Sequence, residues 1–296
     1  MNKWIDAARL RTLPLSLSGI VLAGFLVPEQ QFDWIILFLS VLTASLFQIL
    51  SNYANDYGDG IKGTDNQNRV GPERALQSGI ISPSAMKKAV IFTGILSFIS
   101  ALFLIVYSFG TENILYAILY MVLGIAAIVA AIKYTVGKSA YGYYGMGDFF
   151  VLIFFGLVSV LGGYFLYTKE TDYSILFPAL SIGMLSVAVL NLNNMRDIEN
   201  DRKSNKNTIP VKLGLENAKK YHIVLITLPF FLSSAYIFHH IHSKWQWLFV
   251  IPYLFLFIHL IKIIQTNNPK DFDPELKKVA LLSFLFSLLF GLGNIL

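Results

Sequence analysis

The sequence contains no cysteine, and only 14% of its 296 residues are charged. The absence of cysteine excludes disulfide bonds, thiolate nucleophiles, iron–sulfur clusters and zinc sites built on cysteine. The low charge, together with 55% hydrophobic residues and a mean hydropathy of +0.59, excludes a soluble domain of this length. We therefore expect a protein that crosses a membrane several times.

Nine stretches of the chain are free of Asp, Glu, Lys and Arg. Each holds roughly 17–23 residues, which is enough for a helix to cross the ~30 Å of hydrocarbon in a bilayer. The stretches are about 12–28, 34–55, 89–111, 113–132, 149–168, 173–195, 221–243, 245–261 and 279–296. The sequence thus predicts an all-α integral membrane protein with nine transmembrane helices in a single bundle, formed by one domain over residues 1–296.

The basic residues are distributed unevenly between the two sides of this bundle. If the N-terminus is cytoplasmic, every one of the 23 Lys and Arg residues except Lys169 and Lys244 falls on the cytoplasmic side. Because short cytoplasmic loops carry an excess of Lys and Arg, this bias predicts a cytoplasmic N-terminus and an outside C-terminus. The net charge of +5 then reflects topology and not a surface for nucleic acid.

Two acidic clusters follow long apolar stretches. They lie at the start of the two longest loops expected on the cytoplasmic side, about 56–88 and 196–220. Residues three or four apart share one face of a helix, so each cluster forms a polar stripe. The stripes consist of Gln48, Asn52, Asp56 and Asp59, and of Asn193, Asp197 and Asp201. Because ionisable groups at the border of a membrane are costly, both stripes are candidates for a function.

The two stripes together have the composition of a metal site. Hard divalent cations prefer oxygen ligands, and Mg²⁺ is typically held by one or two carboxylates plus the phosphate oxygens of a substrate. Basic residues in the same loops suit such a phosphate, namely Lys62, Arg69, Arg74, Arg202, Lys203 and Lys206. We therefore favour a site for a metal–diphosphate. Two other interpretations stay open: simple flanks or caps of the helices, and a divalent-cation transporter, although transporters place their ion sites near the midplane.

Both clusters resemble motifs of a known family. The run Asn55-Asp56-Tyr57-Gly58-Asp59 resembles the first aspartate-rich motif, NDxxD, of the UbiA superfamily of intramembrane aromatic prenyltransferases. The run Asp197-Ile198-Glu199-Asn200-Asp201 resembles its second motif, DxxxD. Further segments are similar to the branch of this superfamily that acts on 1,4-dihydroxy-2-naphthoate, at 8–14, 62–65, 69–76, 134–137, 144–148, 154–156, 193–197 and 206–208. The resemblance implies a bundle around a central cavity, with cytoplasmic cap loops.

The resemblance also implies a reaction. A polyprenyl group would pass from polyprenyl diphosphate to 1,4-dihydroxy-2-naphthoate in the presence of Mg²⁺, with loss of CO₂ and diphosphate. The product would be demethylmenaquinone, made for menaquinone biosynthesis at the inner (cytoplasmic) membrane of a bacterium. The partners are then the two substrates and the lipid bilayer, with no nucleic acid, while protein partners and prenyl chain length stay open. The residues alone also leave open another acceptor, such as 4-hydroxybenzoate, homogentisate or haem.

Metal-binding roles follow from the same resemblance. It implies that Asp56, Asp59, Asp197 and Asp201 are catalytic as ligands of Mg²⁺, with Asn52, Asn55, Asp65 and Asn193 as further metal ligands. Many members of the superfamily have another aspartate where this sequence has Gly63, so we expect Asp65 to take its place. The asparagines could instead cap helices or bond between them.

Substrate-binding roles are assigned in the same way. We expect Lys62, Arg69, Arg74 and Lys206 to bind the diphosphate, and Arg11, Thr12, Tyr141, Tyr144 and Asp148 to meet the aromatic substrate. The basic residues could also serve only to set topology, and tyrosines gather at membrane interfaces in any case. The histidines His239, His240 and His242 lie at the opposite end of the seventh span, so we interpret them as interfacial rather than as metal ligands.

Overall fold

The structure is a computed structural model, and it describes residues 3–66 and 70–296. Within these two ranges, nine helical spans are long and apolar enough to cross a membrane, which confirms the nine predicted spans. They are Lys3–Leu26, Trp34–Lys62, Pro83–Phe109, Ile114–Lys133, Gly147–Thr168, Tyr173–Arg196, Leu215–His239, Lys244–Gln265 and Pro269–Ile295. The chain is therefore a multi-pass membrane protein.

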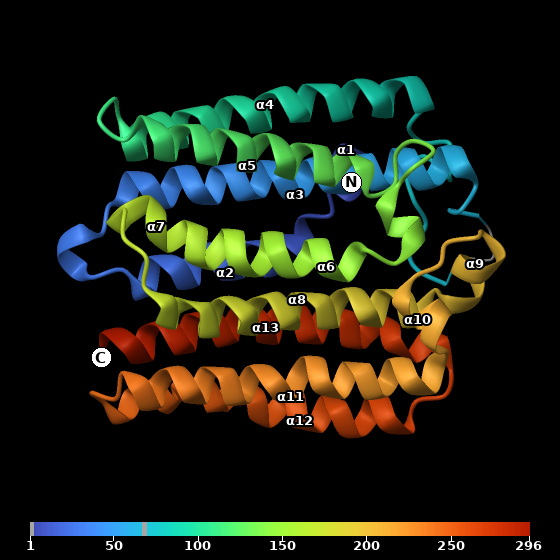
Figure 1. Cartoon of the computed structure of the whole chain (residues 1–296). Helices are drawn as coiled ribbons and strands as arrows, with labels where there is room; N and C mark the ends of the chain where they lie inside the picture. Colours follow the sequence, from blue (N-terminus) through green and yellow to red (C-terminus); the bar gives the residue numbers. More distant parts are fainter. Residues whose placement is uncertain (1–2, 67–69) are drawn as a thin grey trace.

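Most spans combine a long helix with short flanking turns (Figure 1). The first half contains α1 (Lys3–Ala8), η1 (Leu10–Thr12), α2 (Leu13–Leu26), η2 (Glu29–Gln31), α3 (Trp34–Lys62), α4 (Pro83–Phe109), α5 (Ile114–Lys133) and η3 (Tyr141–Tyr144). The fifth span combines α6 (Gly147–Val151), the π-helix η4 (Leu152–Gly162) and α7 (Gly163–Thr168). The remainder contains η5 (Tyr173–Ile175), α8 (Leu176–Arg196), α9 (Ile198–Lys203), α10 (Ile209–Leu213), α11 (Leu215–His239), η6 (Lys244–Phe249), α12 (Val250–Gln265), η7 (Pro269–Phe272) and α13 (Asp273–Ile295).

The first acidic cluster lies on a helix and not in the loop after it. Helix α3 ends only at Lys62, where Gly63 follows with a φ of 71°, a left-handed conformation that favours glycine. Asp56 and Asp59 are both buried on this helix. The predicted start of the loop, at about 56, was therefore wrong, because the helix continues through both aspartates and ends only at Gly63.

The second acidic cluster spans a break between two helices. The predicted loop at about 196–220 in fact contains α9, α10 and the first turn of α11. The helix is interrupted at Asp197, but the N–H of Asp197 donates to the carbonyl of Asn193 at 3.1 Å. The N–H of Asp201 donates in turn to the carbonyl of Asp197 at 2.8 Å. The predicted stripe therefore keeps its helical spacing across the break.

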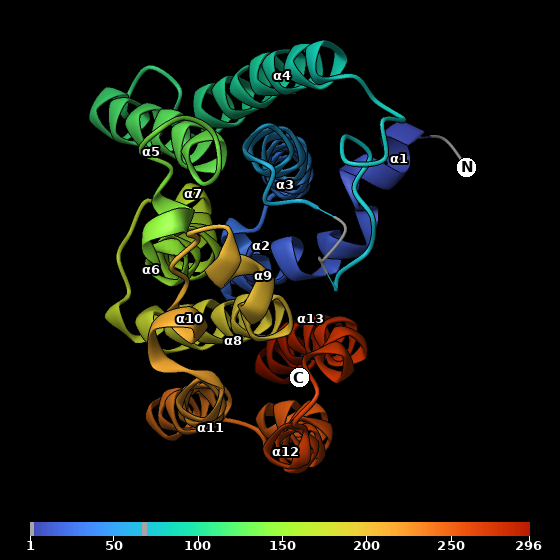
Figure 2. The same ribbon diagram turned by 90° about the vertical axis from the view of Figure 1, so that its right-hand side faces the viewer.

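The helices run side by side in one bundle, and both clusters lie at the same end of it (Figure 1). Viewed along the helices, α2, α3, α5, α6 and α7 enclose one part of the bundle, and α11 and α12 lie beyond α8 and α13 (Figure 2). The C-terminus is at the end opposite the clusters (Figure 1). Helix α8 belongs to the most buried span and α5 is the most exposed one, so α8 forms the centre of the packing.

A pair of glycines brings the fifth span close to α8. A Cβ atom added at Gly156 would lie 2.6 Å from the carbonyl oxygen of Ala179 and 2.8 Å from the Cα of Gly183. Small residues allow the backbones of membrane helices to approach in this way. The contact therefore fixes the π-helical segment against the most buried span, and the opposite face of that segment is left for a cavity.

A chain of buried polar side chains ties the C-terminal helices together. His222 of α11 and His259 of α12 contact each other through their Nε2 atoms at 2.9 Å, and Nδ1 of His259 contacts the carboxylate of Glu275 at 2.6 Å. The amide of Asn191 reaches Nδ1 of His222 at 3.4 Å. The N–H at Nδ1 of His259 donates a hydrogen bond to the carboxylate of Glu275, so Nε2 of His259 accepts a hydrogen bond from Nε2 of His222. Four helices are therefore linked by one directional chain of hydrogen bonds.

Candidate functional site

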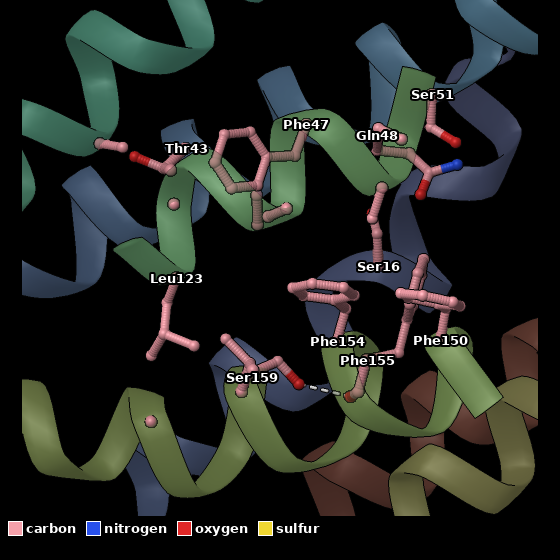
Figure 3. A pocket seen from close by; sticks show the side chains of 18 of the residues that line it. Ser16, Thr43, Phe47, Gln48, Ser51, Leu123, Phe150, Phe154, Phe155 and Ser159 are labelled. Atoms are coloured by element: carbon pink, nitrogen blue, oxygen red, sulfur yellow. Dashed lines mark hydrogen bonds between the residues drawn. The ribbon is translucent and has the colours of Figure 1, made fainter. Parts of the chain in front are cut away.

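An apolar cavity of about 320 Å³ lies between α2, α3, α4, α5 and the fifth span. Its walls include Phe47 of α3, Leu123 of α5 and Phe154 of η4, whose rings and side chain point into the space between the helices (Figure 3). Its three amide side chains, Gln48, Asn52 and Asn55, all lie on the part of α3 that leads to Asp56 and Asp59, whereas small hydroxyl side chains such as Ser16, Thr43 and Ser159 lie elsewhere in the lining. The cavity therefore has an apolar body and a polar end beside the aspartates.

The π-helix shapes one wall of this cavity. It runs over Leu152–Gly162, and the hydroxyl of Ser159 donates to the carbonyl of Phe155 within it (Figure 3). The hydroxyl of Tyr120 on α5 donates to the carbonyl of Gly162 at 2.7 Å, at the end of the π-helix. π-Helical turns are rare and are frequently found at functional sites. The apolar sequence of this span predicts a helix but does not reveal this local geometry.

The N-terminal segment is fastened to the polar end of the cavity. The hydroxyl of Thr12 accepts from the amides of Gln48 at 3.0 Å and Asn52 at 3.2 Å, and it donates to the carbonyl of Arg9 at 2.9 Å. The Asn52 amide also donates to the carbonyl of Ala8 at 2.8 Å. Asn52 and Thr12, which we predicted to meet a metal and the aromatic substrate, thus bind each other in this structure.

Asp56 carries a buried carboxylate without a partner. Its exposed fraction is 1%, and among the described residues neither carboxylate oxygen has a hydrogen-bond partner. Buried charges are otherwise paired or coordinate metals, because desolvation of an isolated carboxylate is very costly. Asp56 therefore fits a ligand for a cation. It also lines a second hollow of about 560 Å³, together with Arg9, Arg11 and Arg74.

Asp59 is paired with two residues from distant loops. Its carboxylate accepts from the hydroxyl of Tyr143 at 2.8 Å and from Nζ of Lys206 at 3.0 Å. The Tyr143 hydroxyl also contacts the hydroxyl of Thr64 at 2.5 Å. Tyr143 was not among the predicted site residues, although it lies within the same tyrosine-rich segment as two that were. It connects the loop after α5 to the first cluster.

Lys206 lies between the two clusters. Burial lowers its pKa, but the carboxylates of Asp59 and Asp201 outweigh that effect and raise the pKa above its ordinary value. The ammonium also lies 5.4 Å from the ring centre of Tyr143 and 6.0 Å from that of Tyr134. Burial raises the pKa of Tyr134 to about 12. Lys206 is therefore held as a cation by two carboxylates and two aromatic faces.

Arg196 organises the rest of the second cluster. Its guanidinium donates to the carboxylate of Asp197 at 2.6 and 3.1 Å, to the amide oxygen of Asn193 at 2.8 Å and to the carboxylate of Asp273 at 2.5 Å. The second cluster is joined to the first through Asn200, whose amide donates to the carbonyl of Thr64 at 2.9 Å. Arg196 was not among the predicted site residues, and its contact with Asp273 spans 77 positions of the sequence.

The remaining predicted ligands of metal and diphosphate are spread around this cluster. Asp65 is buried and lies 3.9 Å from Nε of Arg74, and Asn55 accepts from the hydroxyl of Thr135 at 3.4 Å. The ammonium of Lys62 lies 3.8 Å above the ring of Tyr143. Arg69 lies outside the described residues. In the part of the chain that the structure describes, no three acidic or histidine side chains converge to hold a metal on their own.

The residues predicted for the aromatic substrate are divided. Tyr141 lines the cavity, where its ring stacks on Phe150 with centres 4.0 Å apart, and Arg11 lines the hollow beside Asp56. Tyr144 is 58% exposed, and Asp148 turns toward α11, where it accepts from Tyr221 at 3.0 Å. Neither of these two lines the cavity or the hollow. The partner of Asp148 is 73 positions away in the sequence, so its direction could not be inferred from the tyrosines beside it.

Residues 16–288 match the UbiA prenyltransferase family, and the chain belongs to this family. A protein from Haemophilus influenzae named 1,4-dihydroxy-2-naphthoate octaprenyltransferase is 41% identical to it, over 99% of this chain and 96% of the relative. The protein of the same name from Escherichia coli is 39% identical over 98% of this chain and 94% of the relative. The expected family is therefore confirmed.

Solved structures show the same fold. A UbiA homologue from Archaeoglobus fulgidus, described as bound to GPP and Mg²⁺, is similar with a TM-score of 0.66 and 17% identity, over 99% of both chains. The same homologue bound to DMAPP and Mg²⁺ gives a TM-score of 0.65 at 17% identity, again over 99% of both chains. The predicted all-helical membrane fold of the UbiA type is thus confirmed.

Proposed function

We propose that this chain transfers a polyprenyl group from polyprenyl diphosphate to 1,4-dihydroxy-2-naphthoate, with loss of CO₂ and diphosphate, to give demethylmenaquinol, the reduced form of demethylmenaquinone, for menaquinone biosynthesis. One observation carries the proposal: an apolar cavity in the bundle has its polar end beside two aspartate clusters and a buried lysine. The two relatives near 40% identity, which carry the name of this activity, support the choice of acceptor.

The diphosphate belongs at the aspartates. Asp56 fits a cation because its buried carboxylate lacks a hydrogen-bond partner among the described residues, and Asp59, Asp197, Asp201, Asn55 and Asp65 would supply further oxygen ligands. Mg²⁺, when bound there, neutralises the charge that builds up on the leaving diphosphate. Lys206, Lys62 and Arg74 supply positive charge to the same anion. The two solved homologues described with Mg²⁺ and a prenyl diphosphate support this choice of cofactor.

The polyprenyl chain belongs in the cavity. Phe47, Phe154 and Leu123 provide an apolar wall and keep water away from the allylic carbocation that forms when the C–O bond to diphosphate breaks. The faces of Tyr134 and Tyr141, which line the same cavity, favour a cation at its polar end. Because the cavity is small for a long polyprenyl chain, the end of that chain farthest from the diphosphate would extend into the bilayer.

The acceptor belongs between the cavity and the N-terminal segment. Arg11, with Arg9, provides positive charge for the carboxylate of the naphthoate at the hollow beside Asp56. The ring carbon that bears the carboxylate attacks the allylic carbon, and the C–C bond to the carboxylate then breaks, which returns its electron pair to the ring and releases CO₂. The bias of basic residues supports a cytoplasmic position for this end of the bundle, at the inner membrane of a bacterium.

A product assay tests the proposal. Purified full-length protein is incubated with Mg²⁺, a long prenyl diphosphate and a panel of aromatic acids, and the products are analysed by mass spectrometry. We expect a prenylated product only from 1,4-dihydroxy-2-naphthoate, with a mass that reflects the loss of CO₂. A product from 4-hydroxybenzoate or homogentisate instead would assign this protein to another branch of the family. Flux of Mg²⁺ into proteoliposomes without any product would favour the transporter.

A further inference from the structure

We infer that Lys206 is an internal counter-cation that occupies the space between the two aspartate clusters until a metal–diphosphate replaces it. Divalent metal would then bind poorly alone, and diphosphate would be needed to draw the lysine away from Asp59. The inference rests on the proposed function, since it concerns the diphosphate site. It adds an order of events: the metal enters together with the diphosphate.

The contacts of Lys206 are those of a buried ion pair. Its Nζ lies 3.0 Å from Oδ2 of Asp59, and the two side chains are 10% and 12% exposed. Asp201 acts on the same ammonium from the second cluster. A divalent ion bound to Asp59 and Asp201 would thus lie within a few ångströms of a positive charge. At that distance the repulsion is substantial, because a buried pair is little screened.

The backbone around Lys206 is fixed, so the side chain alone has to move. The N–H of Lys206 donates to the carbonyl of Asp201 at 2.8 Å, and the N–H of Asn207 donates to the carbonyl of Tyr143 at 3.0 Å. The rings of Tyr143 and Tyr134, 5.4 and 6.0 Å from the ammonium, offer it a second position. From there it could still contact the oxygens of the diphosphate.

Two neighbours show that this arrangement is specific to Lys206. Arg196 binds Asp197, Asn193 and Asp273 at once, so its removal from the carboxylate would break several contacts. Asp56 has no hydrogen-bond partner among the described residues. The ammonium of Lys206, in contrast, is joined to Asp59 by one hydrogen bond, so it can leave that carboxylate without the loss of several others.

Titration of the purified protein with Mg²⁺ alone tests the inference. Binding is followed by isothermal calorimetry, first without any anion and then with a saturating non-reactive analogue in which a thio or methylene group replaces the bridging oxygen of prenyl diphosphate. Lys206→Met removes the charge, and Lys206→Gln removes it while a donor to Asp59 remains. Lys220→Met is the matched control, because Lys220 is an exposed lysine on α11 that is not among the predicted site residues.

For wild type we expect weak metal binding that tightens roughly 10-fold or more with the analogue, within the usual range for coupled sites. Both Lys206 variants should bind Mg²⁺ alone roughly 10-fold more tightly than wild type, and the analogue should then add little. Lys220→Met should behave as wild type. Unchanged or weaker binding of Mg²⁺ alone in Lys206→Gln overturns the inference. If wild type forms the prenylated product in that case, the proposed function stands without it, whereas absence of product in wild type refutes the function itself.

Discussion

The substitution Glu275→Ala tests how strongly the buried polar chain holds the C-terminal helices together. Glu275 is 1% exposed, and its carboxylate contacts His259 at 2.6 Å, Lys262 at 2.7 Å and Lys278 at 3.1 Å. Alanine removes all three contacts. It also leaves the N–H at Nδ1 of His259 buried without an acceptor.

The contact with His259 should dominate the loss of stability. A buried donor left without a partner costs about 1–3 kcal/mol. The side chains of Lys262 and Lys278 are 49% and 46% exposed, so solvent screening reduces their ion pairs to about 0–1 kcal/mol each. Hydrogen bonds between membrane helices are often weaker, at about 0.6 kcal/mol on average. These contributions sum to about 1–5 kcal/mol, and the weaker hydrogen bonds of membrane helices reduce the upper end, so we expect Glu275→Ala to lower the free energy of unfolding by about 1–4 kcal/mol.

Thermal unfolding of the purified protein in detergent measures this effect. Glu199→Ala is the matched control, because Glu199 also forms an ion pair, 3.0 Å from Arg202, but the two side chains are 64% and 52% exposed. Its loss should cost less than about 0.5 kcal/mol. Glu275→Gln keeps an oxygen acceptor for His259 and should recover part of the stability. If Glu275→Ala and Glu199→Ala unfold at the same temperature, the polar chain does not hold these helices and the reasoning is refuted.

Three further predictions concern the aspartate clusters. Asp56→Asn should nearly abolish prenyl transfer, yet in metal-free buffer it should be about 1–3 kcal/mol more stable than wild type, because it removes a buried charge without a partner; a fall in Tm would contradict this. Tyr143→Phe removes a 2.8 Å hydrogen bond to Asp59 and should raise the KM for prenyl diphosphate a few-fold with little change in kcat, as steady-state kinetics can show. Lys206→Met should lower the Tm of the metal-free protein by the same amount at about pH 6 and about pH 9. The pKa of Lys206 is raised in the folded protein, so its ion pair stabilises fully at any pH below the ordinary lysine pKa, and this contribution is lost only as pH rises through the folded pKa. A smaller decrease in Tm at pH 9 than at pH 6 would argue against this pairing.

The spans were predictable because a single physical constraint dominates them. A helix in hydrocarbon tolerates few charges, so charge-free stretches identify spans without knowledge of their packing. The same reasoning gave the wrong end for α3. It ended the span before the first charge, whereas Asp56 and Asp59 are buried charges on the helix itself. Helical spacing then gave the correct stripe, since residues three or four apart share a face whatever the helix packs against.

The partners of the aspartates were not predictable from the sequence. Tyr143 reaches Asp59 across 84 positions, and Lys206 reaches it across 147. Such pairs depend on how three loops meet at one end of the bundle, which no local pattern records. Asp148 illustrates the same point: it lies next to the predicted tyrosines in sequence, but its carboxylate accepts from Tyr221 on α11.

The attachment of the N-terminal segment has a consequence for how the chain folds while it is being synthesised. Thr12 is held by Gln48 and Asn52, which follow it by 36 and 40 positions. The segment therefore cannot reach its final position until the ribosome has produced nearly all of α3. Until then the wall that it forms beside Asp56 is missing, so the hollow at this aspartate is completed only after the second span has entered the membrane.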